Sequence, residues 1–254
     1  KVDSGTQKKK LDAILATAMT LMKAGDHVVV SGSVFGATLQ LFNNIIGKFG
    51  VEVTVVNGTD PKGWQAAVKP NTKMFFLETP SNPLCEVFDI AALAEIADKA
   101  GAQLVVDNCF CSPALQRPLA LGAHIVIHSA TKYLDGHGRV LGGAVVGQKD
   151  FTDQIAGFNR TAGPTLSAFN AWVILRGLDT LRLRMDAQSA AALAVLGDDD
   201  ASARDTQTVG VRTTRKGHTY PSTARAARAV SQAACAASNT ARKSLPSTTW
   251  PGIA

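Results

Sequence analysis

Uninterrupted runs of branched aliphatic residues narrow the choice of fold more than any other feature of this chain. The stretches HVVVSG (27–32), QLVVDN (103–108) and HIVIHSA (124–130) lack the regular polar alternation of a half-exposed strand. VEVTVVN (51–57) and TKMFFLE (72–78) are two further strand candidates. Because continuous apolar strands are covered on both faces, the pattern predicts an α/β fold, a mainly parallel sheet with helices on both of its faces.

Amphipathic stretches between these runs supply the predicted helices. Between positions 11 and 26, apolar side chains recur at helical spacing, which predicts a helix. In residues 89–102 the apolar residues fall on one helical face, and Asp89 is the predicted N-cap. Residues 166–196 are predicted as one long helix with a kink at Gly177.

Most of the candidate chemistry follows the ends of the predicted strands. In parallel sheets, ligands bind beyond the carboxyl ends of the strands. We therefore expect one group of polar and aromatic side chains to meet at that edge: Phe35, Glu78, Asn82, Asp107, Asn108, Ser129, Thr131 and Lys132.

Lys132 comes two positions after the end of the strand candidate 124–130, where the charged ammonium of a lysine would be poorly solvated. Burial favours the neutral amine and lowers its pKa, which suits a nucleophile that forms a Schiff base. The alternative interpretation is a surface lysine whose ammonium reaches water past the strand edge.

The neighbours of Lys132 favour the reactive interpretation. Ser129 and Thr131 offer hydroxyls for a phosphate, and Asp107 ends the strand expected to lie beside this one. An amine for an aldehyde and a carboxylate for a pyridinium nitrogen are what pyridoxal 5'-phosphate (PLP) requires of a protein. The alternatives are a helix cap for Asp107 and core packing for Phe35, which could otherwise lie face-on over a flat ring.

The two ends of the chain differ from its body. Residues 197–254 are rich in Ala, Ser, Thr and Arg and poor in branched aliphatics, and residues 1–10 carry four lysines. Such a tail buries too little apolar area to offset its ordering entropy. We expect a domain at residues 11–196, flanked by atypical segments at 1–10 and 197–254. The second of these is either a disordered tail or the product of a disrupted reading frame.

Charge, length and cysteine spacing exclude several functions. The net charge of +6 resides at the ends, since residues 11–197 carry a net charge of −1, which argues against a folded nucleic-acid surface. We expect neither a membrane span nor a secretion signal, because the sequence has no apolar run of about eighteen residues and no signal-peptide pattern. The histidines and cysteines lack metal-ligand spacing. We expect a soluble, cytoplasmic protein with reduced cysteines and no metal.

Five stretches resemble successive landmarks of the cysteine/methionine-metabolism PLP-dependent enzymes. They are SVFGATLQLF, ETPSNPLCEVFDIAALAEIA, LVVDNCFCSPALQRPL, HSATKYLDGHGRVLGGAVVG and LSAFNAWVILRGLDTLRLRM. Within this family, VDNCFCSPALQ and KYLDGHGRVLGG are most similar to the O-succinylhomoserine sulfhydrylases, relatives of cystathionine γ-synthase. The resemblance implies the large domain of the type I PLP fold and a homotetramer.

The resemblance also implies a role for each candidate residue. Lys132 would carry the PLP aldehyde as a Schiff base, and Asp107 would pair with the ring nitrogen. The remaining contacts would be a phosphate site at Ser129 and Thr131, a stacked ring at Phe35 and a polar contact at Asn82.

The implied reaction is a γ-replacement in which O-succinylhomoserine and sulfide give homocysteine and succinate, a step of methionine biosynthesis. Two departures leave an alternative open. Lysines and a leucine stand where the family has a Ser-Gly-Met phosphate-binding turn, and no match to its C-terminal substrate-carboxylate arginine is found. The alternatives are a catalytically impaired remnant of the large domain and chemistry of the cystathionine γ-synthase or γ-lyase type.

Overall fold

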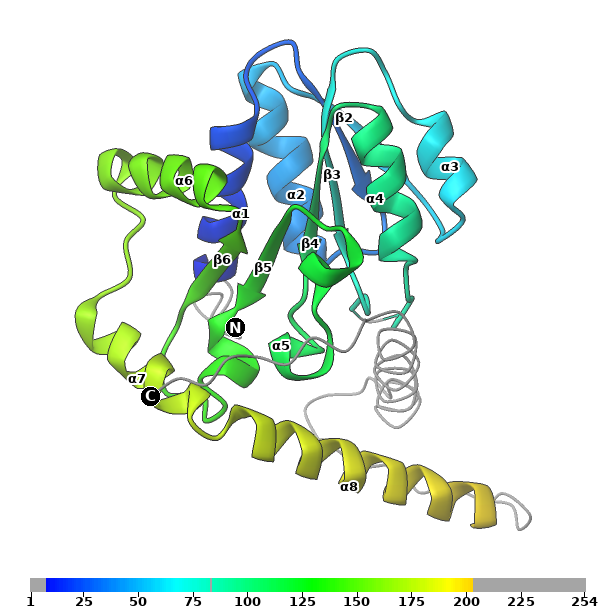
Figure 1. The fold of residues 1–254 in the computed structure, drawn as a ribbon, viewed down its shortest axis with the longest axis vertical. Coiled ribbons are helices and arrows are strands. Elements are labelled where there is room, and N and C mark those ends of the chain that lie inside the picture. Colours follow the sequence, from blue (N-terminus) through cyan, green and yellow to red (C-terminus); the bar gives the residue numbers. More distant parts are fainter. Residues whose placement is uncertain (1–7, 83, 203–254) are drawn as a thin grey trace, which may run out of the picture.

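A six-stranded sheet forms the centre of the molecule (Figure 1). The computed structural model describes residues 8–82 and 84–202. The sheet order is β2-β1-β3-β4-β5-β6, and all neighbouring strands are parallel except β5 and β6. The strands are β1 His27–Ser31, β2 Glu52–Val56, β3 Thr72–Glu78, β4 Gln103–Asp107, β5 Ile125–Ser129 and β6 Gly143–Gly147. The predicted α/β class and the parallel sheet are confirmed.

Helices cover both faces of this sheet (Figure 1). Helices α1 and α2 pack on one face, and α3 and α4 pack on the other. The helices are α1 Lys8–Leu21, α2 Gly36–Asn44, α3 Pro61–Ala66, α4 Ile90–Lys99, α5 Ser112–Leu115, α6 Lys149–Ala162, α7 Ala168–Leu178 and α8 Leu181–Ser202.

Alternation along each strand divides the core into two layers. In β3, Met74 and Phe76 face α1 and α2, whereas Phe75 and Leu77 face the layer built around Trp64 of α3. All five side chains are at most 1% exposed. Because side chains of a strand point alternately to the two faces, an unbroken apolar run is what a doubly covered strand requires.

Local signals in two helices have different outcomes. Asp89 caps α4 as predicted, since its side chain accepts a hydrogen bond from the Ala92 amide. The long helix predicted for residues 166–196 is instead two helices, α7 and α8, which are separated at Asp179 and Thr180. Gly177 lies inside α7 rather than at a kink.

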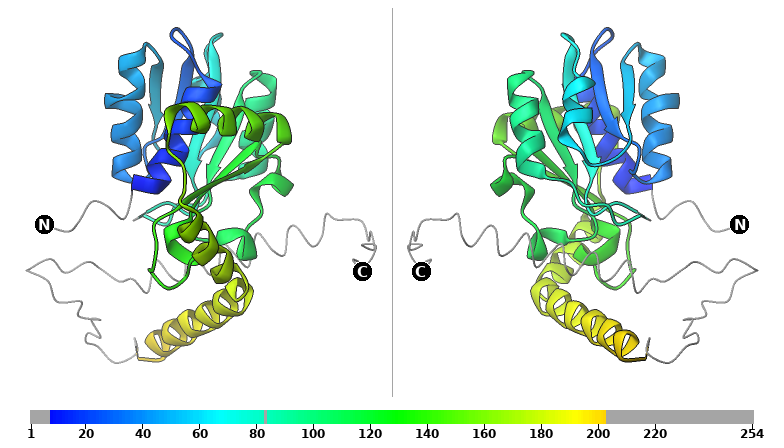
Figure 2. Two further views of the ribbon diagram at one scale, coloured as in Figure 1. Left: turned by 90° about the vertical axis from the view of Figure 1, so that its left-hand side faces the viewer. Right: turned by 90° about the vertical axis from the view of Figure 1, so that its right-hand side faces the viewer.

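Among the α-helices and β-strands, four were not anticipated: α3, α5, β6 and α6. At the predicted domain boundary, α8 continues to residue 202, six residues beyond 196. Figure 2 shows α8 extending away from the layers of the sheet. The predictions for residues 1–7 and 203–254, including the disordered or frame-disrupted tail, lie outside the described residues.

Among the helices that the structure describes, none combines the length and the apolarity that crossing a bilayer requires. Cys109 and Cys111 are buried free thiols. Cys235 lies outside the described residues.

Candidate active site

The carboxyl ends of three adjacent strands bring the predicted site residues together. Glu78 of β3 is paired in register with Asp107 of β4, and Asp107 is paired with Ile127 of β5. Two residues further along β5 is Ser129, where the strand ends. The prediction that the strands of Asp107 and Ser129 are neighbours is confirmed.

A cavity of about 400 Å³ opens beside these strand ends. Its volume lies within the range of small-molecule sites, roughly 300–1,000 Å³. Five of the residues expected at this edge line it: Phe35, Glu78, Asn82, Ser129 and Lys132. Its other lining residues are Lys10, Cys109, Phe110, Tyr133, Gly136, Gly138 and Gln188.

Asp107 is a fully buried carboxylate immediately behind the cavity wall. It is 0% exposed and does not itself line the cavity. Lys10 does line the cavity, and its Nζ lies 2.6 Å from Asp107 Oδ2. Within the described part of the chain, Asp107 Oδ1 has no hydrogen-bond donor. The carboxylate therefore has one charge partner and one open oxygen.

Lys10 is the site residue that the sequence interpretation missed. Its Nζ also lies 3.6 Å from Glu78 Oε2 and 5.4 Å from the centre of the Phe35 ring. Burial opposes its positive charge, but the negative charges of Asp107 and Glu78 outweigh burial and raise the pKa of Lys10. Helical periodicity was the available signal, because Lys10 precedes the buried Ile14 by four positions.

Glu78 is a buried carboxyl group that keeps its proton up to about neutral pH. Burial, followed by the nearby charge of Asp107, raises its pKa from 4.5 to about 7, although Lys10 and the Phe35 amide lower it. Its Oε2 accepts a hydrogen bond of 2.9 Å from the Phe35 backbone amide. The carboxyl group thus links the end of β3 to the loop that carries the aromatic ring.

We expect Glu78 to make the stability of the ligand-free protein fall as the pH rises from about 4.5 to about 7. In this window the folded state binds more protons than the unfolded state, so the free energy of unfolding decreases by at most about 1.4 kcal/mol per pH unit. Urea unfolding of the wild type and Glu78→Gln across this window measures the effect, since the variant should lose that slope. Glu95→Gln, at a side chain 75% exposed, is the matched control and should follow the wild type. Parallel curves for Glu78→Gln and the wild type would contradict the assignment.

Lys132 is placed by an abrupt turn of the backbone after β5. A π-helical turn at residues 130–134 includes Lys132 at φ −87° and ψ −119°, outside helical values. Its side chain lines the cavity as predicted, but the residue is exposed. The expected burial of this lysine was wrong, because the turn carries it beyond the covered part of the strand to the cavity mouth.

The two predicted phosphate hydroxyls have different surroundings. Ser129 is 4% exposed and lines the cavity. Thr131 Oγ1 accepts a hydrogen bond of 3.1 Å from the Gly142 amide, and no part of Thr131 lines the cavity. Asn108, also expected at this edge, bonds to Ser112 and Gln116 and holds the loop after β4. Ser129 is thus the hydroxyl that faces the cavity.

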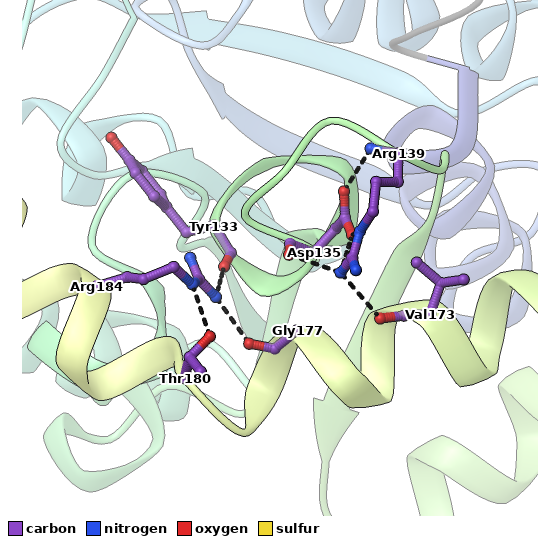
Figure 3. Close-up of polar contacts among 7 residues, drawn as sticks. All are labelled: Tyr133, Asp135, Arg139, Val173, Gly177, Thr180 and Arg184. Carbon is purple, nitrogen blue, oxygen red and sulfur yellow. Dashed lines mark hydrogen bonds and ion pairs between the residues drawn. The ribbon is translucent and has the colours of Figure 1, made fainter.

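Two arginines connect the turn of Lys132 to helices α7 and α8 (Figure 3). Arg184 Nη2 donates to the carbonyl oxygens of Tyr133 and Gly177 at 2.9 and 2.8 Å. Arg139 donates from its backbone amide and Nε to the buried Asp135 carboxylate. Burial alone would raise the pKa of Asp135, but these bonds and the Arg139 charge lower it overall.

Helix α7 can approach this turn closely because residue 177 is glycine. A Cβ at Gly177 would lie 2.3 Å from the Leu134 carbonyl oxygen, which is too close for any side chain. The backbone of the turn therefore packs directly against α7, and this contact fixes the position of Lys132.

Comparison with known proteins agrees with this geometry. The profile of the family described as Cys/Met metabolism PLP-dependent enzyme matches residues 9–197. The O-succinylhomoserine sulfhydrylase of Pseudomonas aeruginosa is 60% identical over 185 residues, which are 73% of this chain and 46% of that protein. The L-methionine γ-lyase of Treponema denticola is 44% identical over 189 residues, 73% of this chain and 47% of that protein.

A solved structure shares the fold as well. The metB protein of Corynebacterium glutamicum superposes with a TM-score of 0.73 at 39% identity, covering 76% of this chain and 50% of that one. The chain spans about half the length of the curated relatives it matches. These similarities confirm both the resemblance found in the sequence and the type I fold, and the chain belongs to the Cys/Met metabolism PLP-dependent enzyme family.

Proposed function

We propose that residues 11–196 form the PLP-binding large domain of an enzyme that converts O-succinylhomoserine and sulfide to homocysteine and succinate. The observation that carries the PLP part of the proposal is the convergence of Lys132, Ser129 and Phe35 on one cavity with Asp107 behind it. The 60% identity to an O-succinylhomoserine sulfhydrylase supports the choice of reaction.

The residues of the cavity fit the chemical groups of PLP. Lys132 offers a primary amine for the aldehyde, and the Ser129 hydroxyl is a donor for the phosphate. The open Oδ1 of Asp107 is a buried acceptor of the kind that a protonated ring nitrogen needs. The Phe35 ring borders the same space and would stack on the flat ring, with Asn82 as a further polar contact.

Each residue then has a physical task. When bound, PLP supplies an electron sink for charge that develops on substrate carbons. Lys132 Nζ holds the aldehyde and moves protons at those carbons, and the Arg184 and Asp135 contacts hold its turn in place. Thr131 contributes by bonding Gly142 and thereby anchoring the turn beside Ser129.

In the reaction, the Cγ–O bond to succinate breaks and a Cγ–S bond to sulfide forms. The test is to incubate the chain with PLP, O-succinylhomoserine and sulfide, and to quantify homocysteine and succinate. Equal amounts of both products are expected. Ammonia and 2-oxobutanoate in place of homocysteine would instead assign the γ-elimination that the similarity to a methionine γ-lyase suggests.

We also propose that the chain assembles into a homotetramer. Exposed apolar side chains on α7 support assembly, because Phe169 and Trp172 are 67% and 57% exposed. A contiguous apolar surface of this kind is typical of interfaces.

A further inference from the structure

The ion pair between Lys10 and Asp107 has no role in the proposed chemistry. Lys10 is 7% exposed, and it reaches the site from the first turn of α1. Its ammonium contacts Asp107 at 2.6 Å and Glu78 at 3.6 Å, and it lies 5.4 Å from the centre of the Phe35 ring. These three groups surround the part of the cavity where a cofactor ring would lie.

The ammonium stands between the cavity and the carboxylate. Lys10 lines the cavity and Asp107 does not, so a ring in the cavity meets Lys10 before it meets the Asp107 oxygens. A protonated ring nitrogen and an ammonium are both cations, and both require the same buried carboxylate. Two like charges within a few ångströms of each other in a poorly solvated site repel strongly.

We propose that Lys10 is an internal substitute for the cofactor's ring cation, so that it keeps the ligand-free site neutral and must leave before PLP can bind. This inference rests on the proposed PLP-binding function. It defines two states of the chain, one with Lys10 paired to Asp107 and one with Lys10 withdrawn.

The position of Lys10 makes withdrawal accessible. The first turn of a helix lacks part of its backbone hydrogen bonding and opens more easily than the centre. Among the described residues, the Lys10 side chain bridges α1 to Glu78 of β3 and Asp107 of β4 through ion pairs. Withdrawal therefore needs the first turn to move and leaves the sheet unchanged.

Removing the ammonium should tighten PLP binding and lower the stability of the protein in the absence of PLP. If the withdrawn state is about 10% to about 0.1% populated, Lys10→Met should lower the apparent Kd for PLP by about 10-fold to about 1,000-fold. The same variant should unfold at a lower temperature without PLP, because Asp107 and Glu78 are then buried without a counter-charge. Saturating PLP should restore most of this loss.

The experiment is a PLP titration of the wild type, Lys10→Met, Lys10→Arg and Lys23→Met. Bound PLP is measured by equilibrium dialysis and by visible absorbance, and thermal unfolding is recorded with and without PLP. Lys10→Arg keeps the charge and should bind PLP as weakly as the wild type. Lys23 is an exposed lysine that follows the same helix, so Lys23→Met is the matched control for loss of one positive charge.

The outcomes separate this inference from the proposed function. Tighter binding by Lys10→Met alone supports the inference. Equal Kd values for the wild type and Lys10→Met overturn it and leave PLP binding intact, whereas no binding by any variant overturns both. Borohydride reduction followed by peptide mapping must place the PLP on Lys132, since an adduct on Lys10 would make Lys10 the acceptor instead.

A second variant covers the case in which Lys10→Met does not fold. Lys10→Met combined with Glu78→Gln removes Glu78 as one of the two carboxyl groups that Lys10 contacts and leaves Asp107, and glutamine retains an oxygen for the Phe35 amide. The double variant is expected to bind PLP more tightly than Glu78→Gln alone. Equal affinities in this pair would overturn the inference.

Discussion

Replacing Lys132 with alanine is expected to abolish covalent attachment of PLP completely. Lys132 lines the cavity from the mouth side, and it is the amine proposed to hold the aldehyde. Without it, no borohydride-stable adduct should form at position 132, and the visible absorbance of the lysine-bound cofactor should be absent. Dialysis can still detect PLP held by the Ser129 hydroxyl and the Phe35 ring alone.

The matched control is Lys149→Ala, at a side chain 81% exposed on α6. This variant should form the adduct to the same extent as the wild type. Formation of the adduct in Lys132→Ala, at the same yield and on another lysine, would remove Lys132 from its proposed role. Unfolding curves of both variants establish that the comparison is made between folded proteins.

Replacing Trp64 with alanine is expected to cause the largest loss of stability. Trp64 is 0% exposed, and its ring lies 6.2 Å from that of Phe75 and 5.7 Å from that of Phe88. Truncating a buried tryptophan destabilises a protein by about 3–5 kcal/mol, because apolar burial is lost and a cavity remains. That is a large fraction of a typical total stability of about 5–15 kcal/mol.

Leu183→Ala is the control, because it truncates a large apolar side chain that is 71% exposed on α8. Its effect should stay within about 0.5 kcal/mol, as for most surface substitutions. Urea unfolding gives both values from the midpoints, provided that the slopes agree. Equal losses in the two variants would show that α3 is not part of the cooperative core.

The strands could be predicted because burial on both faces requires an apolar side chain at every position of a strand, and this pattern is visible in the sequence. Val28, Val29 and Val30 are each 0% exposed, so the sheet is covered on both sides at β1 and the apolar run has no gap. The adjacency of β4 and β5 followed from the same reasoning. Strand β6 was missed, since it begins and ends with glycine and exposes Val146.

The break between α7 and α8 could not be predicted from periodicity. Leu178, Leu181 and Leu183 continue the apolar pattern across Asp179 and Thr180. The helices separate where the backbone of α7 meets the Lys132 turn at Gly177, a contact between segments about forty positions apart. Sequence spacing carries no information on such a contact.

The burial of the two lysines of the site could not be predicted from the sequence either. Sequence reasoning placed Lys132 in a buried position and Lys10 in an atypical terminal segment. In the structure Lys132 is exposed and Lys10 is 7% exposed, because two carboxylates at neighbouring strand ends neutralise Lys10. A lysine is buried only when it is paired, and the pairing depends on the topology rather than on local sequence.

The strand order described above also governs how such a chain can fold. Strand β1 lies between β2 and β3, and all three run parallel, so the centre of the sheet cannot begin as a hairpin. Pairing β1 with β3 closes a loop of some forty residues, and the conformational entropy of that loop is lost before the strand contacts can offset it. Folding should therefore be slower than that of a helical bundle of equal length, and the unpaired edges of β1 and β3 are exposed to aggregation during that delay.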